Sequence, residues 1–314
     1  MRQLLAVMHI EDVARGHVNL KRRQGDPLDI YLRNAVTLTQ SLRVWGWGLT
    51  VMSDAPEVLI KRAAEIGLEK DRLPKFERFD FKLEVPPGIR FRGAHFRFEL
   101  YDAIGRGAFG PEVGMIDVDC VAIGAAPAIV VADDEIIAYP IDWGQAGWRK
   151  VGPDLDRLLG KRPDATLWYG GEFLYGSASA FRKLADRFKE IWPVYTADPR
   201  SFAYVGQEMV LTALLHGTPG IRVRSAHDEK IILRWWSHRT VGRQESFEKA
   251  RRFAILHMPG DKPFLARFAD APFDASDFLR RYEWHLRGRI LASHLSNWTA
   301  WFNRGGVKEV PRLR

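Results

Sequence analysis

The stretch GMIDVDCVAIG, residues 114–124, decides the fold that the sequence predicts. An apolar run reaches Ile116, the chain then reads Asp117-Val118-Asp119, and it becomes apolar again at Cys120. A short apolar run bounded in this way is typical of a buried strand. Residues two apart in extended backbone point to the same side, so we expect both carboxylates to lie together where this strand leaves its sheet.

Strand-like and helical patterns alternate on both sides of this stretch. Short apolar runs predict strands at 4–8, 49–54, 113–117 and 166–177, and a further strand begins the segment 253–264. Helical spacing predicts helices at 31–46, 55–68, 95–106, 179–192 and 208–216. This order predicts an α/β fold with a mostly parallel central sheet flanked by helices.

The C-terminal part of the chain has a different character. It is rich in Arg and Trp at near-helical spacing, with Ser276 as the expected N-cap of a helix. We therefore expect one main domain at 1–268 and a helical C-terminal extension at 269–314. This helix either packs on the domain, the more common arrangement, or makes a peripheral contact with an anionic membrane.

Composition limits the function without choosing it. The chain has 314 residues, with 47 Lys+Arg against 39 Asp+Glu, and this basic surplus suits nucleic acids, anionic membranes or phosphate-bearing ligands. A single cysteine, Cys120, cannot form an internal disulfide and fits a reducing compartment. The N-terminal apolar run is too short for a signal-peptide core, so we expect a cytoplasmic protein.

The paired carboxylates have two interpretations. Two unpaired carboxylates that lie close together repel each other, and a divalent cation such as Mg²⁺ or Mn²⁺ removes that repulsion. The simpler interpretation is that Asp117 and Asp119 cap turns or pair with arginine, which is the more common case for an isolated Asp-x-Asp. The segment ILHMPGDKPF, residues 255–264, favours the metal, because it places His257, Gly260 and Lys262 after a strand. An imidazole can bind a metal, a glycine N–H can approach a phosphate, and a lysine can neutralise it.

These segments resemble nucleotide-sugar glycosyltransferases with the GT-A fold. IDVDCVAIG is similar to their Asp-x-Asp segment, and HMPGDKPF resembles the His-x-x-Gly-x-x-Lys-Pro-Trp signature of glycosyltransferase family 8, whose members retain anomeric configuration. The resemblance implies that Asp119 is the main metal ligand, that Asp117 is shared between metal and ribose, and that His257 is the third ligand. It implies Mn²⁺ or Mg²⁺ as the cofactor.

The same resemblance implies roles for the donor. Lys262, the Gly260 N–H and Arg97, which lies in the helix before the Asp-x-Asp, would hold the diphosphate. The run TLWYGGEFLYGS is similar to the donor-sugar segment of retaining enzymes and has some resemblance to family 6. The residues of this run that would line the sugar pocket are Tyr169, Gly170, Gly171 and Glu172.

YVGQEMVLTALL falls where family 8 carries Asp-Gln-Asp before a helix, although Gly206 replaces the first Asp. Gln207 would lie beside the anomeric carbon, and Glu208 is a candidate acceptor-side residue. A carboxylate at a helix start that is favoured only by the helix dipole is an equal alternative for Glu208.

The resulting hypothesis is a retaining, metal-dependent hexosyltransferase of polysaccharide biosynthesis. It uses a nucleotide-diphosphate sugar such as a UDP-hexose, transfers to a saccharide or lipid-linked acceptor, and binds no nucleic acid. Two alternatives stay open. A nucleotidyltransferase of related α/β fold would need a glycine-rich basic loop after the first strand, of which residues 8–23 hold a loose version. A basic nucleic-acid-binding protein would need aromatic and basic residues on one face.

Overall fold

The computed structural model describes residues 2–14, 25–89, 91–141, 144–160, 167–237 and 247–303, and within these ranges the side chains of 12, 14, 144–146 and 292–303 are not described. Its centre is a seven-stranded sheet with the strand order β3-β2-β1-β4-β7-β6-β8. The strands are β1 (Arg2–Val7), β2 (Trp47–Ser53), β3 (Lys75–Arg78), β4 (Glu112–Ile116), β6 (Glu135–Ile141), β7 (Trp168–Ser177) and β8 (Arg222–Ser225). Strands β1 to β4 are parallel, and β7 alone runs antiparallel to both of its neighbours.

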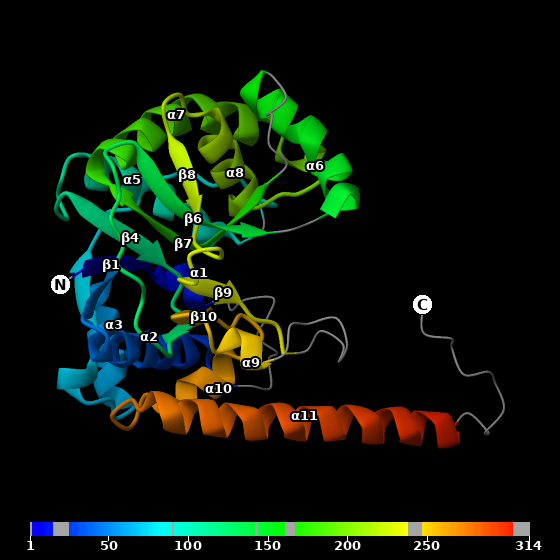
Figure 1. Cartoon of the computed structure of the whole chain (residues 1–314). Coiled ribbons are helices and arrows are strands. Elements are labelled where there is room, and N and C mark those ends of the chain that lie inside the picture. The colour runs from blue at the N-terminus through cyan, green and yellow to red at the C-terminus, as the bar shows by residue number, and fades with distance from the viewer. Residues whose placement is uncertain are drawn as a thin grey trace.

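Helices cover both faces of this sheet (Figure 1). One face carries α5 (Arg97–Gly105), α6 (Gly144–Leu159), α7 (Ala178–Ala197) and α8 (Gln207–Gly217), and the other carries α2 (Pro27–Val44) and α3 (Pro56–Glu65). Short helices α1 (Ile10–Ala14) and α4 (Arg92–His95) lie near the ends of the first strands. The predicted α/β class, with a mostly parallel sheet flanked by helices, is confirmed.

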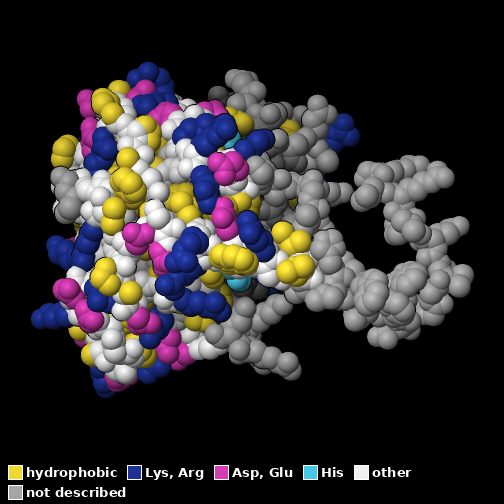
Figure 2. Space-filling view, turned by 60° about the horizontal axis from the view of Figure 1, so that its bottom comes forward, with side chains coloured by type: hydrophobic (Ala, Val, Ile, Leu, Met, Phe, Trp, Pro, Cys, Tyr) yellow, Lys and Arg dark blue, Asp and Glu magenta, His cyan; other side chains and the backbone are white. Residues whose placement is uncertain are grey.

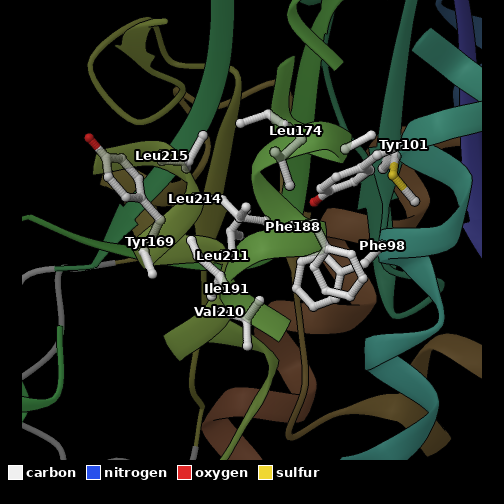
Figure 3. Packing of buried hydrophobic residues seen from close by; sticks show 14 of the residues in the cluster. Phe98, Tyr101, Tyr169, Leu174, Phe188, Ile191, Val210, Leu211, Leu214 and Leu215 are labelled. Carbon is white, nitrogen blue, oxygen red and sulfur yellow. The ribbon is translucent and has the colours of Figure 1, made fainter. Parts of the chain in front are cut away.

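Each helical layer has its own apolar core. The core between the sheet and helices α5, α7 and α8 includes Phe98, Tyr101, Phe188 and Leu211, and Figure 3 shows these side chains in contact. Phe98 stacks on Phe188 and meets Tyr101 edge to face, which are the favoured geometries for aromatic pairs. The second core joins α2 and α3 to the opposite face of the sheet. Burial on both faces explains why β2 reads as a run of apolar and small residues; β7 reads the same way except for the buried Glu172.

A second, three-stranded sheet follows directly from the Asp-x-Asp segment. It contains β5 (Cys120–Ala122), β9 (Ile232–Arg234) and β10 (Ile255–His257), with β10 in the middle. Residues 117–119 are therefore the connection from β4 of the large sheet to β5 of the small one. Strand β10 is antiparallel to β5 with His257 opposite Cys120, so pairing of these strands brings the end of β10 to the two aspartates.

The chain ends in the long helix α11 (Ala275–Asn303), which runs along the base of the molecule beneath α9 (Phe247–Ala250) and α10 (Lys262–Leu265) (Figure 1). Its first half packs on the domain, with Phe278 and Tyr282 fully buried. The expected N-cap Ser276 is wrong, because the helix already includes Ala275, and the Asp277 N–H donates to Asp274 Oδ1 at 2.6 Å. The boundary predicted after residue 268 stays a prediction. None of the helices within the described ranges is both long enough and apolar enough to cross a bilayer.

Candidate functional site

The two aspartates and His257 converge beyond the carboxyl ends of the strands. Val118 and Asp119 lie in a turn and not in the expected extended backbone, and Val118 belongs to the apolar core. The carboxylates of Asp117 and Asp119 nevertheless lie together. One ligand atom from each of Asp117, Asp119 and His257 lies within 4.8 Å of the others. The Asp117 N–H donates to Glu172 O at 3.1 Å, and the Met258 N–H donates to Asp119 O at 2.8 Å, which anchors the turn to both sheets.

The two carboxylates differ in environment. Asp119 is buried and accepts a hydrogen bond from the Lys262 ammonium, while His257 Nε2 lies 3.3 Å from its other oxygen. Burial alone would raise the pKa of Asp119, but Lys262 and His257 lower it well below its usual value. Burial raises the pKa of Asp117, against the opposing charges of Arg97 and His257, and its side chain is 36 % exposed. Asp117 is thus the member of the pair that solvent reaches.

His257 is surrounded by carboxylates. Burial favours its neutral form, yet Asp119 and Glu172 outweigh burial and raise the pKa of His257 to about 9. The protein therefore holds a proton on this imidazole at neutral pH. Two carboxylate oxygens and one imidazole nitrogen are the donor set that suits a divalent cation, and binding one would displace that proton. The residues fit Mn²⁺ or Mg²⁺; the identity of the ion stays a prediction.

Arg97 begins α5 beneath this triad. Its guanidinium donates to Asp117 Oδ1 at 2.8 Å and to the Gly171 carbonyl. It is almost fully buried, and its Nε has no hydrogen-bond partner among the described residues. The family resemblance implies that Arg97 holds the diphosphate. In the structure Arg97 is paired with Asp117, the more exposed of the two aspartates.

A second ionic cluster lies behind the triad and was not predicted. Arg234, at the end of β9, donates to both oxygens of Glu172 at 2.7 and 2.6 Å and to Glu208 Oε1 at 2.6 Å. Glu172 is fully buried; burial raises its pKa, but Arg234 and His257 outweigh burial and lower it to about 2. Glu172 Oε1 also lies 3.6 Å from His257 Nδ1, so this carboxylate is next to the imidazole nitrogen that does not face Asp119. Carboxylates in this position commonly orient a metal-binding histidine.

The adjacent glycines of β7 make room for these two clusters. A Cβ at Gly170 would lie 2.0 Å from Glu172 Oε2 and 2.5 Å from Arg234 Nη2. A Cβ at Gly171 would lie 2.1 Å from Gln207 Nε2 and 2.6 Å from Arg97 Nη1. All four distances are below any contact that a real Cβ makes, so a side chain at either position would displace the charged and polar groups packed against it.

Gln207 and Glu208 begin α8 on the far side of Gly171. Gln207 is buried, and its Nε2 has no hydrogen-bond partner among the described residues, although the side chain lines the cavity. Glu208 accepts hydrogen bonds from Arg234, Tyr204 and Trp168. Of these two predicted catalytic residues, Gln207 therefore has a buried amide nitrogen without a partner among the described residues, and the Glu208 carboxylate is already held by three donors.

A cavity of about 870 Å³ opens above the triad. Its lining includes most of the predicted site residues, namely Arg97, Asp117, Asp119, Gly171, Gln207, Glu208, His257 and Lys262. Residues 85–89 and 91–94 and the end of β1 supply much of the remaining wall, and neither had been predicted. Such a cavity is of the size that holds a cofactor-sized ligand.

Four predicted residues do not line this cavity: Tyr169, Gly170, Glu172 and Gly260. Tyr169 lies in the apolar core, and Figure 3 shows its ring at the edge of that cluster with the hydroxyl turned away. Gly170 and Glu172 form the packed layer behind the lining. Gly260 belongs to the turn between His257 and Lys262. Their contact with a donor stays a prediction. Of the segment 8–23 considered for the nucleotidyltransferase alternative, residues 15–23 lie outside the described residues.

Comparison with known proteins gives the fold. The galactosyltransferase LgtC, in complex with donor and acceptor sugar analogues, is 12 % identical over 85 % of this chain and 95 % of that chain, with a TM-score of 0.51. The bifunctional glycosyltransferase WbbM, in its apo form, is 8 % identical over 89 % of this chain and 51 % of that chain, with a TM-score of 0.50. This chain therefore spans about half of the WbbM chain. No protein-family model matches the sequence, and no curated protein matches it.

Proposed function

We propose that the protein is a retaining glycosyltransferase that takes a sugar from a nucleotide-diphosphate donor, a UDP-hexose, with the help of Mn²⁺ or Mg²⁺. The carrying observation is the convergence of Asp117, Asp119 and His257 at the mouth of a cavity, at the carboxyl ends of the sheet. Ligands of open α/β sheets bind at this edge. The similarity of the fold to glycosyltransferases supports the same class.

The charges of the site suit a diphosphate leaving group. In the proposed reaction the bond from the anomeric carbon to the diphosphate breaks, and a bond to an acceptor hydroxyl oxygen forms. A metal ion held by Asp117, Asp119 and His257 would neutralise charge on the departing diphosphate. Lys262 supplies a second cation, because its ammonium lines the same cavity next to Asp119. Preorganised cations of this kind lower the barrier by stabilising charge as it develops.

Gln207 is the proposed residue at the anomeric centre. An amide is a poor nucleophile, so we propose front-face substitution, in which the acceptor proton passes to the leaving phosphate oxygen. Glu208 is the carboxylate nearest in sequence, but Arg234, Tyr204 and Trp168 occupy it, which disfavours it as a nucleophile. Its proposed role is therefore to shape the acceptor side of the cavity.

The stereochemical proposal predicts the product. A UDP-α-hexose should give an α-glycoside, read from the anomeric coupling in an NMR spectrum of the product. Gln207→Ala should reduce turnover roughly ten- to a hundred-fold, since one lost polar contact is worth on the order of 1–3 kcal/mol. Gln3→Ala is the matched control, because the Gln3 side-chain amide donates to Thr50 Oγ1 and Gln3 does not line the cavity. A β-glycoside would remove the retaining assignment, and a glycosyl-enzyme trapped on Glu208 would replace front-face substitution by double displacement.

We also propose a peripheral contact between α11 and an anionic membrane that carries a lipid-linked acceptor. Trp284 and Leu291 are 66 % and 64 % exposed, and Arg287 lies over the Trp284 ring. Figure 2 brings the base of the molecule, along which α11 runs, toward the viewer and shows hydrophobic and basic side chains interspersed on it. The side chains of 292–303 belong to the same predicted segment but lie outside the described residues.

Cosedimentation with vesicles of anionic phospholipid tests this contact. Combined Trp284→Ala and Leu291→Ala should weaken binding about tenfold or more, because burying one large apolar side chain contributes about 1.5–3 kcal/mol. Val194→Ala, an exposed apolar position on α7, should leave binding unchanged. Equal binding of the double variant and the parent protein would contradict the proposed contact.

A further inference from the structure

Asp261 is a buried carboxylate that the proposed reaction does not use. It lies between Gly260 and Lys262 and is only 2 % exposed. Three residues of α11 lie against it: the Tyr282 hydroxyl donates to Asp261 Oδ2 at 2.7 Å, Arg289 Nη1 donates to Asp261 Oδ1 at 2.6 Å, and His285 Nε2 lies 3.6 Å from Oδ1. Burial would raise the pKa of Asp261, but its hydrogen bonds and the charge of Arg289 lower it, so the carboxylate is ionised and fully engaged.

Tyr282 and Arg289 also hold the segment that follows β9. Trp235 Nε1 donates to the Tyr282 hydroxyl at 2.7 Å, and Arg289 Nη1 donates to Ser237 Oγ at 2.6 Å. Tyr282 and Arg289 thus each bridge the turn after β10 and the segment after β9. We call Asp261, Tyr282 and Arg289 the C-terminal clamp.

Each of these two segments leads directly out of the site. The segment after β9 begins at Arg234, which holds Glu172 and Glu208. The turn after β10 begins at His257 and ends at Lys262, and it is short: Asp261 N–H donates to Met258 O at 3.0 Å. The two are joined by a hydrogen bond of 2.8 Å from Trp235 N–H to His257 O. A displacement of Asp261 would therefore be transmitted to His257 and Lys262 through only a few backbone bonds.

We propose that α11 positions the site through the C-terminal clamp, and that Tyr282 and Arg289 are positioning residues for His257 and Lys262. Neither residue lines the cavity, so they act only through Asp261 and the two segments. Outer partners of metal ligands typically change metal affinity roughly 10- to 100-fold when removed. The C-terminal helix is then part of the catalytic unit, whatever else its exposed face contacts.

The test compares Arg289→Ala with Arg280→Ala in the full-length protein. Arg280 lies on the same helix and pairs with Asp277 at the surface, so it controls for loss of an α11 arginine. The first readout is hydrogen exchange of the Phe264 and Leu265 amides, which donate to Asp261 O, without any ligand. The second is the calorimetric Mn²⁺ affinity in the presence of UDP; this part rests on the proposed function. Tyr282→Phe replaces Arg289→Ala if that variant does not fold.

In Arg289→Ala the Phe264 and Leu265 amides should exchange faster, and the variant should bind Mn²⁺ roughly 10- to 100-fold more weakly than the parent protein. Arg289→Lys should recover part of the affinity, because it restores the charge with fewer donors. Unchanged exchange, or faster exchange with parental Mn²⁺ affinity, would overturn the positioning role. Faster exchange in a protein whose parent binds no Mn²⁺ and no UDP would instead reject the proposed function and leave the mechanical link between α11 and this turn intact.

Discussion

Asp119→Asn is expected to abolish metal-dependent UDP binding and, at the same time, to destabilise the protein. The substitution removes one of the three proposed metal ligands, so the loss should exceed the roughly 10- to 100-fold effect of losing an outer partner. It also removes the counter-ion of Lys262, whose side chain is only 3 % exposed. Leaving a buried charge without its partner costs about 3–5 kcal/mol. Calorimetry with UDP and Mn²⁺ measures the first effect, and thermal unfolding without metal measures the second.

A double variant separates these two effects. Asp119→Asn combined with Lys262→Met removes both charges, and it should recover much of the lost stability while UDP binding stays absent. Asp117→Asn should weaken metal binding with a smaller loss of stability, since this side chain is partly exposed and the asparagine oxygen can still accept from Arg97. Asp102→Asn, at a surface pair with Arg106, is the control. UDP binding by the parent protein that survives EDTA would overturn the metal assignment.

Arg234→Met is expected to cause the second large effect, a loss of stability that depends on pH. The substitution leaves Glu172, which is fully buried, and Glu208 without their shared cation. Breaking a buried ion pair in this way costs about 3–5 kcal/mol. Arg222→Met, at an exposed pair with Asp134, should cost far less. Chemical denaturation at pH 7 measures both variants.

The pH dependence follows from the pKa of Glu172. Its pKa is about 2 in the folded protein against an ordinary value of 4.5, so its ionised form contributes stability above pH 4.5. This contribution, about 3 kcal/mol, is lost as the pH falls from 4.5 toward 2. In Arg234→Met the burial of Glu172 is no longer opposed by Arg234, so the difference in stability between parent and variant should shrink as the pH falls from 7 to 4. A difference that stays constant over this range would show that the ion pair does not carry the effect.

Much of the site was predictable because its signals are local. Asp117 and Asp119 follow a strand at a spacing of two, and His257 also ends a strand. The end of β4 lies at the edge of an α/β sheet where ligands bind, so the two aspartates could be expected there. His257 ends β10 of the second sheet, and the pairing of β10 with β5 brings it to them. The α/β class was predictable for the same reason, since alternating strand and helix periodicities are readable within single segments.

The ionic cluster behind the triad was not predictable. Arg234 and Glu172 are 62 residues apart in sequence. Their ion pair depends on the pairing of β9 with β10 and of β10 with β5 in the second sheet. Likewise, the double glycine of β7 suggested a sugar pocket, whereas its close packing is against the side chains of Glu172, Arg234, Gln207 and Arg97.

The sequence by itself determined the α/β class and pointed to Asp117, Asp119 and His257 as a candidate metal triad, because periodicity and strand-end position are properties of neighbouring residues. Only the tertiary structure decided how the charges are partnered: Lys262 with Asp119, Arg97 with Asp117, and Arg234 with two glutamates. It also decided that α11 holds Asp261 beside the site. Ion pairs between distant segments leave no periodic signal along the chain, and burial, which makes each pair matter energetically, exists only once the two sheets and α11 have packed together.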